Sequence, residues 1–194
     1  MKHEFSRTDW ISFLTGEALA AGLLGRILYA YPEKTWLQAL ADDEVFSESP
    51  LGDQQPDVQQ GLALLQSWTQ TVRGGMSSDA FDELRVDYTR LMLGGERVLA
   101  PPWESVYFSE ERLVFQQQTM QVRAWYRRFG VDAMNHAQEP DDHIGLEIGF
   151  VAHLAQQALA ALEQEEPDAF ENALGAQREF LSEHLMKWAP QWCN

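Results

Sequence analysis

Apolar residues recur every three or four positions along most of the chain, which is the spacing that places side chains on one face of an α-helix. The first such stretch starts at Trp10, and Pro32 ends it because proline cannot continue a helix. Its apolar positions are Phe13, Leu14, Ala20, Ala21, Leu24, Ile27, Leu28 and Tyr31. The same spacing predicts a short helix over 36–40 and a longer one over 58–72.

The middle of the chain contains residues that can cap further helices. Ser78 or Asp79 is a good N-cap for a fourth helix, since its side-chain oxygen can accept a hydrogen bond from a first-turn amide. Ser109 is expected to cap another helix, which ends at Gly130 and whose acidic first turn suits the positive end of the helix dipole. Between these two helices, the glycine and proline pairs within 94–107 predict a structured loop.

The last third of the chain predicts two long helices. One opens at Asp141 or Asp142, and the other runs from about Pro167 to Trp188. No run of strict alternation indicates a strand, and the sequence has no internal repeat. We therefore expect an all-α fold, a single-domain helical bundle of about seven or more helices over 1–194, with an exposed and flexible loop at 42–57.

The chain is acidic, with 30 Asp and Glu residues against 14 Lys and Arg residues, so its formal charge is −16. This charge repels nucleic-acid phosphates and anionic lipid and attracts a cationic partner, although solubility alone would also account for it. A hydrophobic share of 45%, with seven Trp and ten Phe residues, indicates a folded core rather than a disordered chain. The composition thus excludes a generic DNA or RNA binder without naming the partner.

Signals for export and for disulfide bonding are missing from the sequence. Cys193 has no second cysteine to pair with, which excludes an intramolecular disulfide and fits a reducing compartment. The N-terminus is polar, and Glu17 and Arg26 interrupt the apolar stretch that follows it. The arginine pair at 127–128 lies too deep in the chain to be an export signal of its own. We expect a cytoplasmic protein without a signal peptide or a membrane span.

A first segment that is unusual for a bundle of amphipathic helices runs from Asp87 to Gly94 and continues through Pro101 and Pro102. Its prolines fix a rigid turn that can present Trp103 and Tyr107 side by side, each with a large apolar surface and one polar atom. The alternative is that both rings simply pack under the loop.

A second unusual segment, Glu139-Pro-Asp-Asp-His143, places three carboxylates and a histidine within five residues at a predicted helix start. One aspartate is enough to cap the helix. Glu139 and the other aspartate are then free to accept an arginine, because the planar guanidinium fork suits a two-oxygen acceptor. The segment therefore predicts a cation-binding surface.

A metal site is the alternative interpretation of this second segment. His143 and Glu147 lie four residues apart and could ligate a metal together with Glu139 or His136, which leaves a metal-binding helical protein or enzyme as an open hypothesis. The sequence lacks the two-histidine zinc-protease pattern and the ligand sets of di-iron bundles. It also lacks a nucleophile elbow, a phosphate loop and a dinucleotide fingerprint, and Ser105 has no activating context.

The residue spacing in the two unusual segments matches known motifs. Tyr88, Leu91 and Gly94 have the spacing Tyr-x-x-Leu-x-x-Gly, and Trp103 follows in Pro-Pro-Trp-x-Ser-Val-Tyr. Glu139 begins a match to the signature Glu-Pro-x-Asp-His. In both motifs and in their order, the chain resembles the TorD/DmsD/NarJ family of redox-enzyme maturation chaperones, above all its TorD and DmsD branch.

The resemblance implies a non-enzymatic chaperone that needs no cofactor. Such a chaperone binds the twin-arginine signal peptide of a molybdopterin-containing oxidoreductase and holds the apo form of that enzyme until its cofactor is inserted, before export by the twin-arginine translocation (Tat) pathway. Components of the Tat translocon are further expected partners. The resemblance assigns signal-peptide binding to Tyr88, Leu91, Gly94, Pro102, Trp103, Tyr107, Glu139, Pro140, Asp142 and His143.

Such a peptide joins an arginine pair to an apolar stretch, so the aromatic residues would bind its apolar part, and Glu139 and Asp142 its arginines. His143 would position the acidic group or sense its protonation. Members of the family continue with further helical sequence beyond the stretch at 184–188, whereas this chain ends at Asn194. A shortened chain, or a homodimer that exchanges a final helix, would account for this difference.

Overall fold

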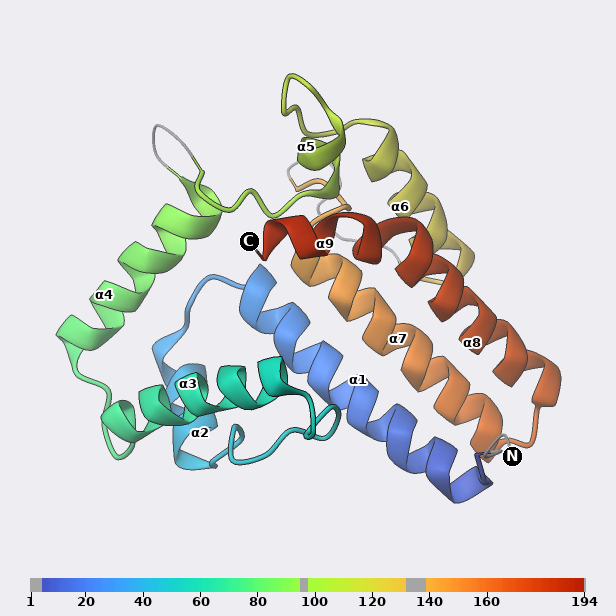
Figure 1. Cartoon of the computed structure of the whole chain (residues 1–194), viewed down its shortest axis with the longest axis horizontal. Helices are drawn as coiled ribbons and strands as arrows, with labels where there is room; N and C mark the ends of the chain where they lie inside the picture. The colour runs from blue at the N-terminus through green and yellow to red at the C-terminus, as the bar shows by residue number, and fades with distance from the viewer. Residues whose placement is uncertain (1–4, 95–97, 132–138, 194) are drawn as a thin grey trace. The chain divides into compact units, whose positions relative to one another are not determined.

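The computed structural model describes residues 5–94, 98–131 and 139–193 (Figure 1). The chain forms two compact units, one made of Met1–Tyr29 with Pro101–Asn194 and the other of Ala30–Ala100. The described ranges contain helices and no β-strand, so the predicted all-α class is confirmed. The assignment of 1–194 to a single domain stays a prediction.

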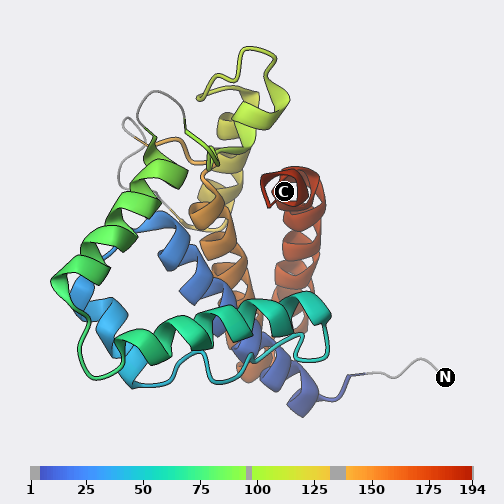
Figure 2. The same ribbon diagram turned by 60° about the vertical axis from the view of Figure 1, so that its left-hand side comes forward.

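The first unit is built on three helices that run side by side, with α7 between α1 and α8 (Figures 1 and 2). Its elements are α1 (Arg7–Tyr29), α5 (Glu104–Phe108), α6 (Gln117–Arg128), α7 (Ile144–Glu163), α8 (Pro167–Phe180), the π-helical turn η2 (Leu181–Leu185) and α9 (Met186–Trp192). Val122, Phe150, Leu154 and Phe180 belong to a core cluster of α6, α7 and α8. A second cluster joins α1 to α7 and α8 around Leu14.

Glycines allow α1 and α7 to approach each other closely. A Cβ atom on Gly25 would lie 2.8 Å from the carbonyl oxygen of Gly145, and a Cβ atom on Gly145 would lie 2.6 Å from the carbonyl oxygen of Gly25. Such distances leave no room for a side chain at either position. The crossing brings Tyr29, at the end of α1, next to the start of α7.

The second unit contains α2 (Lys34–Asp42), α3 (Pro56–Val72), α4 (Ser78–Tyr88) and the π-helical turn η1 (Thr89–Leu93). Its buried apolar residues are Leu37, Leu40, Ala41, Phe46, Val72, Met76 and Met92. The Gln38 side chain links α2 to the end of α3, since it donates to the Val72 carbonyl oxygen at 3.0 Å and accepts from the Met76 amide at 2.6 Å. Of the predicted loop 42–57, Asp42 belongs to α2 and Pro56 and Asp57 belong to α3, and Phe46 within it is buried.

The start of α4 differs by one residue from the prediction. Ser77, rather than Ser78 or Asp79, is the N-cap, because its hydroxyl oxygen accepts a hydrogen bond from the Ala80 amide at 3.0 Å. The predicted loop at 94–107 also contains a helical turn, α5, which begins at Glu104.

Two predicted helix starts in the first unit were wrong. The helix expected from Ser109 begins only at Gln117, since Arg112 and Phe115 have φ angles of 54° and 58°, which a right-handed helix cannot contain. The helix expected from one of the two aspartates begins after them, and His143 is its N-cap.

Two helices, α1 and α7, are long and apolar enough to cross a membrane by length and composition alone. Core helices of soluble proteins pass the same test. The apolar window of α7 is 56% buried inside the protein and that of α1 is 22% buried. The packing of α7 between two other helices explains its apolar composition.

Candidate functional site

The proline-braced loop, residues 101–107, meets the acidic segment, residues 139–143, at the start of α7. Trp103 pairs with His143 in an antiparallel β-bridge. Beside this bridge, the Ile144 amide donates a hydrogen bond to the Pro102 carbonyl oxygen at 2.7 Å. The proline-braced loop is therefore fixed directly against the acidic segment, within the first unit.

Asp142 is an internal cap and is completely buried. One carboxylate oxygen accepts from the Ser105 amide at 2.7 Å, and the other accepts from the Thr119 hydroxyl at 2.7 Å. Its carbonyl oxygen accepts from the Glu104 amide at 2.9 Å. Asp142 thus caps the short helix α5 and joins it to α6.

Asp141 is also completely buried and forms an ion pair with Arg123. Both Nε and Nη2 of that arginine lie 2.7 Å from the same carboxylate oxygen. The Tyr126 hydroxyl donates to the Asp141 carbonyl oxygen at 3.0 Å. The expectation that one of the two aspartates is left free for a partner's arginine is therefore wrong, because both are engaged inside the protein.

Glu139 is the carboxylate of this segment that keeps contact with solvent, since its side chain is only half-buried. Its Oε1 accepts a hydrogen bond from the Trp103 indole nitrogen at 2.7 Å. Burial raises the pKa of Glu139, and the nearby charge of Asp142 raises it further, while the Trp103 hydrogen bond opposes both effects. A cation that approached this group would relieve its unfavourable burial.

His143 is buried and caps α7, because its Nδ1 accepts from the Gly145 amide at 3.1 Å. The rings of Tyr29 and Trp103 meet it edge-on, with centroids 5.2 and 6.1 Å away. Burial lowers the pKa of His143 to about 4. The ring is therefore neutral near pH 7 and supports the segment rather than sensing protonation there.

A buried acidic cluster joins α5, α7, η2 and α9 and was not predicted from the sequence. Its members are Glu104, Glu147, His184 and Trp188. Glu104 Oε2 lies 2.8 Å from His184 Nδ1, and the Trp188 indole nitrogen donates to Glu147 at 3.1 Å. Burial, followed by the negative charge of Glu104, raises the pKa of Glu147 well above its ordinary value. The one signal in the sequence was the spacing of His184 and Trp188, which places both on one face of a helix.

The geometry does not favour the alternative metal site. Glu139 faces Trp103, the imidazole of His143 faces the α7 amides, and Glu147 faces Trp188. Within the described ranges, no three His, Cys, Asp or Glu side chains are arranged to hold a metal ion. His136, which this alternative also used, lies outside the described residues.

The aromatic residues of the proline-braced loop are half-buried. The ring of Tyr107 packs against Trp188, with centroids 5.2 Å apart, whereas Trp103 is held by Glu139. Pro102 and Pro140 are buried and shape the two segments. The Tyr107 ring is therefore partly used in internal packing, as the alternative predicted, while Trp103 lies beside the half-exposed carboxylate of Glu139.

Three of the predicted site residues belong to the second unit. Tyr88 packs edge-on against Tyr31, with centroids 5.6 Å apart, and Leu91 is 43% exposed. Gly94 has a φ angle of 74°, and a Cβ atom there would lie 2.6 Å from the Val98 side chain, so only glycine fits. The predicted site residues therefore fall into two groups, one in each unit.

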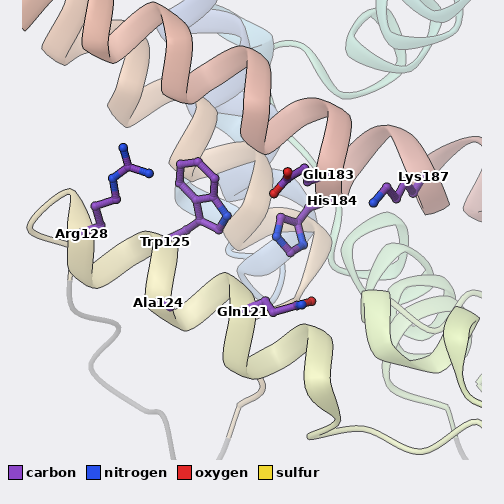
Figure 3. A pocket seen from close by; sticks show the side chains of 7 residues that line it. All are labelled: Gln121, Ala124, Trp125, Arg128, Glu183, His184 and Lys187. Atoms are coloured by element: carbon purple, nitrogen blue, oxygen red, sulfur yellow. The ribbon is translucent and has the colours of Figure 1, made fainter.

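At least three grooves lie on the described part of the first unit. One, of about 560 Å³, is lined by α6, η2 and α9, where Arg128 and Lys187 lie with Glu183 and the ring of Trp125 (Figure 3). Its mixed charges select no single class of ligand. Another groove, of about 360 Å³ and mostly apolar, is lined by α1, α7 and the end of α6 and includes Tyr29, which also contacts His143.

Comparisons with known proteins agree on one family. The family model described as "Nitrate reductase delta subunit" matches residues 53–194. The chaperone protein TorD of Vibrio cholerae is 30% identical over 185 residues, which cover 95% of this chain and 76% of that protein. The Tat proofreading chaperone DmsD of Salmonella typhi is 26% identical and covers 91% and 76%. A solved redox enzyme maturation protein from Archaeoglobus fulgidus is 17% identical, covers 94% and 97%, and has a TM-score of 0.44, too low to add weight.

Proposed function

Because this chain belongs to the nitrate reductase delta subunit family, we propose that it binds the twin-arginine signal peptide of a molybdopterin-containing oxidoreductase. It then holds the apoenzyme in the cytoplasm until the cofactor is inserted, before Tat export. The relatives are named as chaperones, which confirms the predicted class of redox-enzyme maturation chaperone rather than enzyme. What we propose beyond this class is that the chain binds the signal peptide through its arginines and holds the client enzyme.

The observation that carries the proposal is the half-buried carboxylate of Glu139 held by the indole of Trp103. A carboxylate that has already lost part of its hydration gains more from a guanidinium than a fully solvated one does. The indole hydrogen bond fixes its orientation, and the indole ring adds an apolar surface beside it. A cation followed by apolar side chains is the ligand that such a surface favours.

The remaining predicted residues take supporting or separate roles in this proposal. Asp142, Pro140, His143 and Pro102 hold the two segments in place from within the protein. Tyr107 extends the apolar surface. In the second unit, the exposed Leu91 offers an apolar surface to a different part of the client, and Tyr88 and Gly94 belong to the same unit.

The test is isothermal titration calorimetry of the protein with a synthetic twin-arginine signal peptide. Wild-type protein should bind it saturably, and Glu139→Gln should weaken binding by about 10- to 100-fold, since one charge-assisted interaction is worth roughly 1.5–3 kcal/mol. Glutamine can still accept the Trp103 hydrogen bond, so the fold is kept.

Glu163→Gln, at an exposed position, is the matched control and should bind as wild type does. A peptide with both arginines replaced by glutamine should bind weakly to all three proteins. If wild-type protein binds neither peptide, the proposed function is wrong.

A further inference from the structure

An apolar groove along α1, α7 and the end of α6 reaches the acidic segment, because its lining residue Tyr29 contacts His143. The other neighbour of His143 is Trp103, which donates a hydrogen bond to Glu139. The groove is lined mainly by apolar surface, including Tyr29, Leu146 and Phe150, and it has a volume of about 360 Å³. Pockets of this size accommodate small organic groups. All of its lining residues belong to the first unit.

One position that lines this groove, Gly149, has no side chain. A Cβ atom added there would have no neighbour within 4 Å, although Gly145, one helical turn earlier, is packed against α1. Gly149 also lines the groove, so a side chain at this position would project into its open space. The backbone of Gly149 also packs against α1, since a Cβ atom on Gly25 would lie 2.9 Å from its nitrogen, but a Cβ atom on Gly149 itself would face the groove.

One end of the groove is negatively charged. Burial raises the pKa of Tyr29, and the charges of Glu139 and Asp141 raise it further, which indicates that both carboxylates act on this residue. Asp141 forms an ion pair with Arg123, whereas Glu139 keeps contact with solvent. Arg26 also lines the groove and is exposed.

We propose that this groove holds an apolar side chain of the client signal peptide, beside the arginine that Glu139 binds. This inference rests on the proposed function and adds to it the subsite for the apolar stretch. Charge and polarity favour this occupant, because a cation suits the acidic segment at one end of the groove and an apolar group suits the apolar surface around Gly149.

The length of the groove limits how much peptide it can hold. Along α7 it extends from Gly145 to His153, which is about 12 Å at 1.5 Å per helical residue. An extended peptide covers this distance in about four residues at about 3.3 Å each. Only the residues next to the arginine pair are therefore held here.

The test fills the groove with a side chain introduced at Gly149. Gly149→Ala places its Cβ atom in open space, and both Ala and Leu improve helix propensity over Gly. Thermal unfolding checks that Gly149→Leu stays folded beside the crossing with α1. We expect Gly149→Leu to weaken binding of the signal peptide at least tenfold and Gly149→Ala to weaken it less. Gly175→Ala in α8, where a Cβ atom also meets nothing, is the matched control and should bind as wild type does.

A second peptide, with alanine in place of the apolar residues next to the arginine pair, makes the test specific. It should bind wild type more weakly than the parent peptide does, and Gly149→Leu should bind both peptides alike. The subsite is disproved if Gly149→Leu binds the parent peptide as wild type does, or if the variant changes only the oligomeric state. Failure of wild type to bind the peptide at all would instead contradict the proposed function.

Discussion

Glu139 and Glu147 are acidic residues near the same end of α7, but they are held in opposite ways. Glu139 keeps contact with solvent and has one indole hydrogen bond, while Glu147 is completely buried beside Glu104 and Trp188. Burial raises the pKa of both. Among acidic residues that lie close together, a carboxylate can therefore bind a partner only if solvent reaches it, and a fully buried one has a structural role.

Removing Asp142 should have the largest effect, because this residue belongs to the structural side of the comparison. Asp142→Ala leaves the Ser105 amide and the Thr119 hydroxyl without their buried acceptor. We expect the free energy of unfolding to fall by about 2–5 kcal/mol in urea denaturation. Asp168→Ala, at an exposed position, should change it by less than about 0.5 kcal/mol. An equally small change for Asp142→Ala would show that its buried contacts are not needed.

The pH dependence of peptide binding should identify Glu139 as the binding carboxylate. Its pKa is raised in the free protein, and a bound arginine lowers it again, so affinity should be constant at neutral pH and fall as the pH drops through the raised value. The fall, up to tenfold per pH unit, should begin above the ordinary value of 4.5. Calorimetry on Glu139→Gln should lack this component. A variant with the same pH profile as wild type would assign the binding charge to another group.

Glu147→Gln should have the smallest effect, and only at higher pH. The pKa of Glu147 is raised in the folded state, so its contribution to stability is complete below the unfolded-state pKa and is lost as the pH rises through the folded-state pKa. Glutamine cannot ionise and still accepts from Trp188. The variant should therefore have a higher Tm than wild type at pH 8, by about 2–4 °C for each kcal/mol, and no advantage at pH 4. Glu163→Gln should match wild type at both values, and a lower Tm for Glu147→Gln at pH 8 would mean that the buried charge stabilises the fold.

The sequence predicted the long helices well because their apolar spacing is local. The start of α6 was predicted too early, since the residue types at 109–116 do not indicate the left-handed conformations of Arg112 and Phe115. The sequence also could not tell which carboxylate of the acidic segment stays available. The partners of Asp142 lie 37 and 23 residues away along the chain, and the partner of Asp141 lies 18 away, so only the fold brings them together.

The bond between His184 and Glu104 joins residues that are 80 positions apart in the chain. With the Trp188 contact to Glu147, it connects α9 to the proline-braced loop through the protein interior. Local opening of the last helical segment would break both bonds, and opening of the loop would break the bond between Glu104 and His184, so we expect the two segments to open together as one cooperative unit. In hydrogen exchange, amides of α5 and α9 would then share one opening rate, and a client bound at the loop would slow exchange at the far end of the chain.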